Sequence, residues 1–367
     1  MRKYIFVLGC MFFLLAFAPL HAATGQCRDC HTQTTLQWLK SQHAHANENP
    51  LYHAMLDVDP NSSENECTRC HNPVVALNLA TTSQDSNTSN QCDVCHAFKI
   101  EHKKNQYRFV PSAGKTGPFK DAVSTVHESE FAPEMKKSGF CLACHSQTTD
   151  SHGIGFIDVE AEWRNSDFYQ QNIQCQDCHM PTVAGITAPE GKKRKLSNHS
   201  FPGGYLAGMV RACITMNSKV VNQGDDLLIS ISLVNDRAGH AVPTASPFRM
   251  IVLTIEALDE NSAVIWKNYR YDPVKESPNT VFARILQDDR GNAPAFPWKA
   301  VGERFDSRLL PNVPRDLKFS APARNIHAIH ISLDYYPMPQ SLARRLNITE
   351  EKFSQPINIA SNEIHID

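Results

Sequence analysis

The 367-residue sequence lacks a long apolar run anywhere after its first 22 residues. A helix that crosses a bilayer needs about 20 consecutive apolar residues. We therefore expect no transmembrane segment in the mature chain. A chain of this length can form two domains.

The sequence also lacks spare cysteines from which a disulfide could form. Ten of its twelve cysteines belong to one repeated pattern, and Cys10 lies in the apolar N-terminal run. Only Cys213 remains, and we interpret it as a small buried apolar side chain in a strand. No internal disulfide is therefore expected, even in an oxidising compartment.

The repeated pattern is Cys-x-x-Cys-His, and it occurs five times at irregular intervals. The irregular spacing excludes a solenoid of equal repeats. The cysteine pairs and the histidine that follows each are Cys27, Cys30 and His31; Cys67, Cys70 and His71; Cys92, Cys95 and His96; Cys141, Cys144 and His145; and Cys175, Cys178 and His179.

This pattern is the attachment signature of c-type haem. Two cysteines three residues apart present both sulfurs to the vinyl groups of one porphyrin, and the histidine falls beneath the iron as its proximal ligand. A zinc site or disulfides would not require a histidine directly after every pair. We therefore predict five covalently bound haem c (heme c) cofactors.

The N-terminus reads as a secretory signal peptide over residues 1–22. A basic start, Arg2 and Lys3, is followed by an apolar centre and by small residues near Ala22. A retained membrane anchor is the alternative, but the apolar run is short. Export agrees with haem attachment outside the cytoplasmic membrane, so we expect a location in the periplasm or at the cell surface.

The formal net charge of −2 underestimates the acidity of the mature protein. Cleavage removes two basic residues and no acid, and haem propionates add negative charge. Such a protein is not suited to nucleic acid. We expect redox partner proteins that are small and of basic or mixed charge.

Residues 23–204 hold all five motifs and few strand-like runs. Short helices are expected at about 34–46, 124–137 and 159–170, with polar loops between them. Such a segment cannot build a side-chain core of ordinary size. The porphyrins would supply the missing apolar surface, so we expect folding to be coupled to haem attachment.

Residues 205–367 show the period-two alternation of strands. Strands are expected at 227–234, 249–258, 263–271, 327–333 and 357–366, with a hairpin turn at 259–262. The segment 272–323 is rich in proline and charge and is expected to be a long irregular insertion. The predicted fold is a mostly α and irregular multihaem cytochrome c domain followed by an antiparallel β-sandwich.

The second axial ligand of each iron decides what the haem can do. A second imidazole gives a low-spin iron that passes electrons, whereas an open position allows substrate chemistry. Histidines outside the motifs exceed the five required, and most lie in the first half.

Several of these histidines lie in motifs that resemble the multihaem cytochromes c of the hydroxylamine-oxidoreductase and tetrahaem cytochrome c type. One is Trp-Leu-Lys-Ser-Gln-His, which ends at His43, and another is the placement of His127 ahead of Phe140 and the fourth motif. The others are Ser-Phe-Pro-Gly-Gly after His199 and Gly-His-Ala-Val-Pro-Thr around His240. The resemblance covers about residues 25–270 and implies that His43, His127 and His199 are distal ligands. It departs at Phe168, where a histidine is usual, and at Ala245, where a glycine is usual.

His102 and His240 are the next candidates, with His45, His53 and His152 in reserve. His102 follows the third motif closely, although it also belongs to a basic run that a solvated surface explains. His240 would pin the β-domain to the haems by a metal bond, or else cap a loop.

The leading interpretation is an electron carrier that passes electrons along five closely packed, mostly bis-histidine haems. One alternative is an oxidoreductase that acts on a small nitrogen or sulfur compound at one open haem. Another is a subunit of an extracellular filament or homo-oligomer, formed through a shared ligand or an exposed strand edge.

Overall fold

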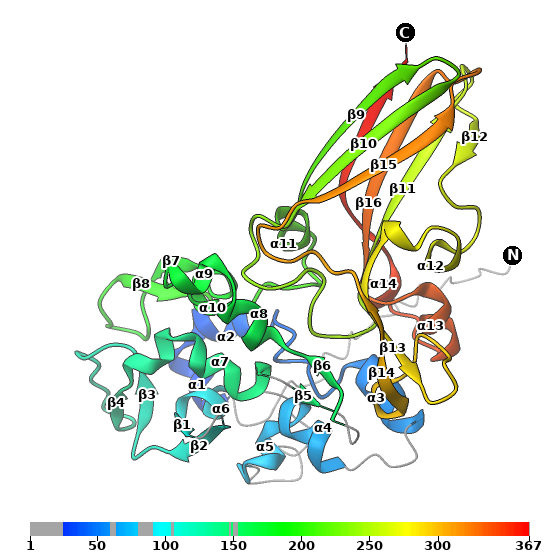
Figure 1. Cartoon of the computed structure of the whole chain (residues 1–367). Coiled ribbons are helices and arrows are strands. Elements are labelled where there is room, and N and C mark those ends of the chain that lie inside the picture. The colour runs from blue at the N-terminus through cyan, green and yellow to red at the C-terminus, as the bar shows by residue number, and fades with distance from the viewer. Residues whose placement is uncertain are drawn as a thin grey trace, which may run out of the picture.

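The computed structural model describes residues 25–58, 64–79, 91–103, 106–146, 148–149 and 153–366. Figure 1 shows a broad region of short helices and strands, from which an arm of long strands projects. We call residues 25–204 the motif half and residues 205–366 the β-rich half. The predicted signal peptide and His152 lie outside the described residues. Within them, no helix has the length and apolar character needed to cross a membrane.

Each Cys-x-x-Cys-His motif lies in a short helix or at its end. The five helices are α1 (Gly25–Cys30), α4 (Glu64–His71), α6 (Cys92–His96), α7 (Ser138–His145) and α10 (Cys175–His179). The other helices of this half are α2 (Thr32–Trp38), α3 (Pro50–Val58), α5 (Pro73–Ala76), α8 (Val159–Arg164) and α9 (Asp167–Gln170).

Four two-stranded sheets lie between these helices, more strand than the sequence suggested. They pair β1 (Phe98–Lys103) with β2 (Gln106–Pro111), β3 (Lys115–Gly117) with β4 (Ser129–Phe131), β5 (Thr148–Thr149) with β6 (Gly155–Ile157), and β7 (Thr182–Gly185) with β8 (Arg194–Ser197). All are antiparallel except the β3–β4 pair.

The three helices expected in this half are only partly present. The first ends at Trp38 and continues as turns, and the third is divided into α8 and α9 at Ser166. The helix expected over 124–137 is absent. Its place is taken by β4 and a 3₁₀ turn, η2 (Pro133–Lys136), because Pro133 removes an amide hydrogen that a continuous helix would need.

Two antiparallel sheets form the β-rich half. The first has the order β15–β10–β9, from β9 (Thr215–Gln223), β10 (Asp226–Val234) and β15 (Arg315–Pro322). The second has the order β14–β13–β11–β16–β17, from β11 (Met250–Leu258), β13 (Val281–Asp288), β14 (Ala300–Asp306), β16 (Ala328–Tyr336) and β17 (Ile357–His365); β12 (Val264–Lys267) pairs with β11. The hairpin predicted at 259–262 joins β11 to β12.

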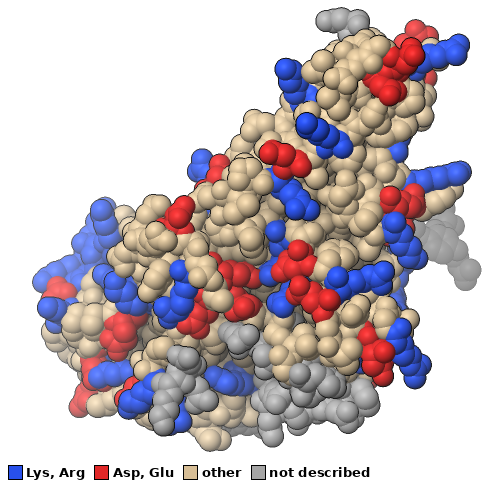
Figure 2. Space-filling view, in the orientation of Figure 1, with Lys and Arg blue, Asp and Glu red and all other residues tan. Residues whose placement is uncertain are grey.

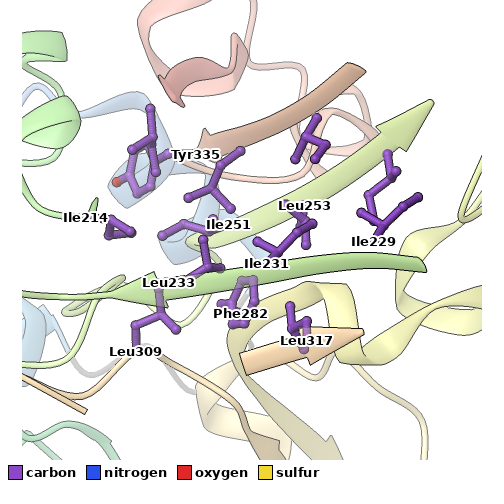
Figure 3. Close-up of a cluster of buried hydrophobic side chains, with 14 of the residues drawn as sticks. Ile214, Ile229, Ile231, Leu233, Ile251, Leu253, Phe282, Leu309, Leu317 and Tyr335 are labelled. Carbon is purple, nitrogen blue, oxygen red and sulfur yellow. The ribbon is translucent and has the colours of Figure 1, made fainter. Parts of the chain in front are cut away.

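One apolar core lies between the two sheets. Along β10 the side chains alternate, so that Leu227, Ile229, Ile231 and Leu233 are buried and their neighbours are not. They pack against aliphatic side chains of the second sheet such as Leu253, as Figure 3 shows. This alternation is the feature that predicted the strand, and it gives this half a core of its own.

The segment 272–323 is not the irregular insertion that we expected. It contains the helix α12 (Pro273–Glu276), two 3₁₀ turns, η3 (Pro278–Thr280) and η4 (Pro297–Lys299), and three strands, β13, β14 and β15. In β13 the burial runs in consecutive positions and does not alternate, because this strand is covered on both faces. A period-two search therefore misses it.

The remaining helices lie where the two halves meet. They are α11 (Ala207–Ala212), α13 (Gln340–Arg345) and α14 (Glu351–Ser354). Leu51 of α3 belongs to the same buried cluster as Leu342 of α13 and Phe353 of α14. Apolar side chains of the motif half thus pack against side chains of the β-rich half. The motif half's own buried cluster, among the residues described, consists of Tyr107, Leu142, Ala143 and Trp163.

Candidate haem centres

The motif helices place each pair of cysteines on one side of a helical turn, since residues three apart lie one above the other. Of these ten cysteines, none is deeply buried: nine are partly exposed and Cys178 is exposed. Each of these residues therefore keeps some surface that a group bound against the helix could contact. The histidine that completes each motif follows one residue after the second cysteine.

Four of the five motif histidines are oriented by a backbone carbonyl. In each of the four, Nδ1 donates to the carbonyl of a residue elsewhere in the chain. The pairs are His31 to Thr187 (2.6 Å), His71 to Ala46 (3.1 Å), His96 to Thr116 (2.7 Å) and His179 to Pro202 (2.6 Å). A carbonyl oxygen can only accept, so Nδ1 carries the proton and Nε2 keeps a free lone pair. This is the tautomer that a metal ligand needs.

Four motif histidines each face a second histidine across a gap of constant width. The ring centroids are 6.4 Å apart for His31 and His127, 6.1 Å for His145 and His43, 6.2 Å for His96 and His199, and 6.3 Å for His179 and His240.

That spacing fits a metal held between the rings. An imidazole–metal bond is about 2.1 Å and a ring nitrogen lies about 1.1 Å from the centroid, so two rings on opposite sides of one ion have centroids about 6.4 Å apart. The residues present thus fit an iron with two imidazole ligands at four of the five motifs.

The histidines opposite the motifs are also prepared as ligands. In three of them Nδ1 donates to a nearby backbone carbonyl. The pairs are His127 to Glu128 (3.0 Å), His199 to Ser197 (2.9 Å) and His240 to Ala241 (2.9 Å). Burial, aided by neighbouring positive charge, lowers the pKa of His43, His199 and His240 to about 4. These rings are therefore neutral at pH 7.

The four opposing histidines come from four different parts of the chain. His43 lies in the turns after α2, and His127 in the loop between β3 and β4. His199 follows β8, whereas His240 lies beyond β10 in the β-rich half. All four were candidates in the sequence, and the structure places each of them opposite a particular motif histidine.

The His240 loop is held in place by residues of both halves. Asn235 is fully buried and donates through Nδ2 to the carbonyls of His240 (2.8 Å) and Leu309 (3.0 Å). From the motif half, Glu162 accepts hydrogen bonds from the Ala241 amide and the Thr244 hydroxyl, each at 3.1 Å. The loop is therefore fixed on both sides of the histidine.

A buried ion pair completes this junction. Arg308 of the β-rich half donates to Glu162 at 2.6 Å and to Asp306 at 2.7 Å. Burial raises the pKa of the Glu162 carboxyl, and Arg308 opposes that shift. Glu162 and Arg308 are 146 positions apart, and no local pattern in the sequence identifies either of them.

Two departures noted in the sequence have clear structural counterparts. Phe168 packs against the loop: a Cβ at Gly239 would meet the Phe168 Cβ at 3.0 Å. Phe168 thus supports the His240 loop from the side. Ala245 has φ of 66°, the left-handed region that favours glycine. The alanine adopts this backbone conformation, and the loop keeps its path.

The His71 centre differs from the other four. The ring of Tyr52 stacks on His71 with centroids 4.1 Å apart. No histidine of the described residues faces His71 as His240 faces His179. His53 is exposed and its Nε2 lies 2.6 Å from the Asn47 carbonyl, and the Nε2 of His45 contacts the Leu39 carbonyl.

His102 stands apart from the motif histidines as well. It lies on β1, is exposed, and stacks on Tyr107 with centroids 4.4 Å apart. Within the described residues its ring does not pair with any motif histidine. Its role as a ligand stays a prediction without support from this geometry.

Cysteines of different motifs lie in contact. The thiols of Cys27 and Cys92 lie close enough that Cys92 lowers the pKa of Cys27, and the same holds for Cys144 beside Cys70 and for Cys141 beside Cys175. The pKa values of Cys141 and Cys144 are raised mainly by their partner cysteines and by burial. Cys95 is near enough to both to add a smaller effect in the same direction. The five attachment points therefore form one connected, branched cluster, in which the fourth motif is the branch point.

Comparison with known proteins agrees with this description. Residues 26–97 match the family model described as "Cytochrome c554 and c-prime". No curated protein sequence matches.

One solved structure, a penta-heme cytochrome c552 from Thermochromatium tepidum, is 23% identical, with a TM-score of 0.80 over 94% of this chain and 99% of the other. The chain therefore has the fold of that cytochrome. Together with the motifs, these matches establish that the cofactor of this chain is covalently bound haem c.

Proposed function

We propose that this chain is an exported multihaem cytochrome that transfers electrons through five haem c groups, of which at least four have two histidine ligands. Bound haem supplies a reversible one-electron couple between ferric and ferrous iron. The protein attaches each group through two cysteines, supplies the axial imidazoles and sets each environment.

The observation that carries this proposal is the set of four histidine pairs. In each pair the ring centroids are separated as those of two axial ligands of one iron would be. An iron with two imidazole ligands has no free position for substrate, so its favoured role is electron transfer.

The contacts between motifs support a continuous path. Cysteines of the first and third, second and fourth, and fourth and fifth motifs lie close enough to shift one another's pKa. Porphyrins joined to neighbouring sulfurs have adjacent edges, which favours electron hopping among all five. The branch at the fourth motif would give such a path three arms.

The same proposal includes the domain organisation of the chain, its cellular location and its partner. The shared core of the two sheets supports a β-sandwich as the C-terminal domain, joined to a pentahaem domain. The N-terminal signal and the chemistry of haem attachment support export to the periplasm or cell surface. In Figure 2, basic and acidic side chains are interspersed over both halves, which favours a redox partner of mixed charge.

One observation favours a second function, reduction or oxidation of a small nitrogen or sulfur compound at one haem. His71 is the motif histidine that has Tyr52, and no described histidine, as its ring partner. The haem at Cys67 and Cys70 is therefore the candidate for an open site.

Electron paramagnetic resonance of the oxidised protein tests the proposal, since it counts low-spin and high-spin irons. We expect at least four low-spin signals. A fifth low-spin signal, with no binding of carbon monoxide to the reduced protein, identifies a pure electron carrier. A single high-spin iron that binds carbon monoxide favours the enzyme. Two or more high-spin irons would contradict the proposal.

A further inference from the structure

Arg249 is a partly buried arginine at the junction of the two halves that lacks a carboxylate partner among the described residues. It lies immediately before β11, and its Nη1 donates to the carbonyl of Thr244 at 3.0 Å. Its Nε is buried and has no hydrogen-bond partner. Arg308, at the same junction, is instead paired with both Glu162 and Asp306.

A second buried donor lies beside it without a partner. Tyr335 on β16 is 3% exposed, and its hydroxyl has no hydrogen-bond partner. Figure 3 shows Tyr335 at one end of the apolar cluster. Burial raises the pKa of this hydroxyl to about 12, so it keeps its proton and can donate.

The two donors converge on Gly204. A Cβ at this glycine would lie 2.7 Å from the Tyr335 hydroxyl and 3.2 Å from the Arg249 guanidinium carbon. The guanidinium also lies over the ring of Tyr205, 5.4 Å from its centroid. Three segments, distant in the sequence, thus place a cation without a carboxylate partner beside a hydroxyl without a hydrogen-bond partner.

The position of this pair relates it to two of the haem centres. Pro202, two residues before Gly204, accepts the hydrogen bond from His179. Thr244, which accepts from Arg249, lies in the loop that carries His240. Arg249 is also close to His145, since after burial its charge helps to lower the pKa of that ring.

A buried guanidinium without a counter-ion is costly, and so is a buried hydroxyl without an acceptor. Both costs disappear if a carboxylate from outside the polypeptide accepts from both groups. The haem propionate is such a carboxylate, and the porphyrin at either neighbouring centre would carry one. An anionic acceptor also forms the stronger, charge-assisted hydrogen bonds.

We propose that Arg249 and Tyr335 form a propionate-binding site for the haem at His179 or for its neighbour at His145. This assignment rests on the proposed attachment of haem at these motifs. The positive charge of Arg249 favours the ferrous state and raises the reduction potential of that haem. Pairing with Arg249 also keeps the propionate ionised, because an adjacent cation lowers the pKa of a carboxyl group.

The test is a redox titration of the haem-loaded protein, monitored by paramagnetic resonance so that each haem is followed separately. In Arg249→Gln, one haem is expected to be harder to reduce, with its ferrous-to-ferric ratio about tenfold lower at a fixed potential. The potential of that haem also becomes pH-dependent near neutrality, because a buried propionate without its cation takes up a proton.

Three further variants sharpen the result. Arg249→Lys keeps the charge and is expected to restore most of the potential. Tyr335→Phe removes only the hydroxyl, so it should fold normally and shift the same haem in the same direction by less. Arg345→Gln removes an exposed arginine of the same half and should leave every potential unchanged.

The haem that moves identifies the source of the propionate, at His179 or at His145. If Arg249→Gln and Tyr335→Phe leave all potentials and their pH dependence as in the unaltered protein, or shift all haems equally, the propionate site is refuted. Failure of the proposed function would be visible earlier, as missing haem or missing low-spin signals in the unaltered protein.

Discussion

The two halves of this chain obtain their cores from different sources. In the β-rich half, two sheets bury a continuous set of aliphatic side chains between them. In the motif half, the buried cluster within the described residues has only four members. The same half carries all five pairs of attachment cysteines. We therefore expect the first half to fold around its cofactors, whereas the second folds around its own side chains.

The sharpest way to test this contrast is to withhold the cofactor. When the full chain is produced without haem attachment, we expect residues 25–204 to be unfolded, because their apolar surface has nothing to pack against. The β-rich half should keep its strands. Limited proteolysis with circular dichroism measures both, and the haem-loaded protein is the control. A haem-free chain that resists protease throughout would contradict the contrast.

The converse test removes a core side chain from the β-rich half. Leu253 is fully buried between the two sheets. Leu253→Ala should lower the free energy of unfolding of this half by about 2–5 kcal/mol, through lost burial and a residual cavity. Denaturant unfolding followed by far-ultraviolet circular dichroism gives this value.

The haem absorption spectrum is the internal control in that experiment. It should stay unchanged in conditions where the variant is still folded. If the haem spectrum of Leu253→Ala changed while its strands were retained, the two halves would not have separate cores.

His240 connects the two halves, because it lies in the β-rich half and faces His179 of the motif half. In His240→Ala one iron loses its second imidazole, so we expect one low-spin signal to be replaced by a high-spin signal. Paramagnetic resonance detects the exchange. His365→Ala, at an exposed position on β17, is the matched control and should leave the spectrum intact. An unchanged spectrum in His240→Ala would rule out ligation by this residue.

The smallest of these effects concerns the ion pair beneath the His240 loop. Glu162→Gln keeps the shape of the side chain but leaves Arg308 with a single carboxylate partner. We expect a loss of about 2 kcal/mol in unfolding free energy, the size of a hydrogen bond to a charged group. Glu363→Gln, which alters only an exposed pair with His365, should change little. Equal effects in both variants would show that the junction does not depend on this pair.

Features that depend on local pattern could be predicted from the sequence. The five motifs are visible as five-residue strings, and β10 is visible because its side chains alternate. In contrast, β13 is buried at consecutive positions and has prolines before and after it, at Pro278 and Pro294, so periodicity does not reveal it.

Features that depend on contact between distant segments could not be predicted. Glu162 and Arg308 meet across 146 positions, and Arg249 meets Gly204 and Tyr335 only in the folded chain. Resemblance to known motifs named His43, His127, His199 and His240, but their pairing with particular motif histidines required the structure. His71 shows the limit of both approaches, since neither assigns it a second histidine.

The most direct test of the account is the mass of the mature protein measured under denaturing conditions, where only covalently attached groups remain. The account predicts the polypeptide mass plus five haem groups, one for each Cys-x-x-Cys-His motif. A mass equal to that of the polypeptide alone, or with fewer haems than motifs, would contradict the claim that haem at all five sites forms the core of the first half.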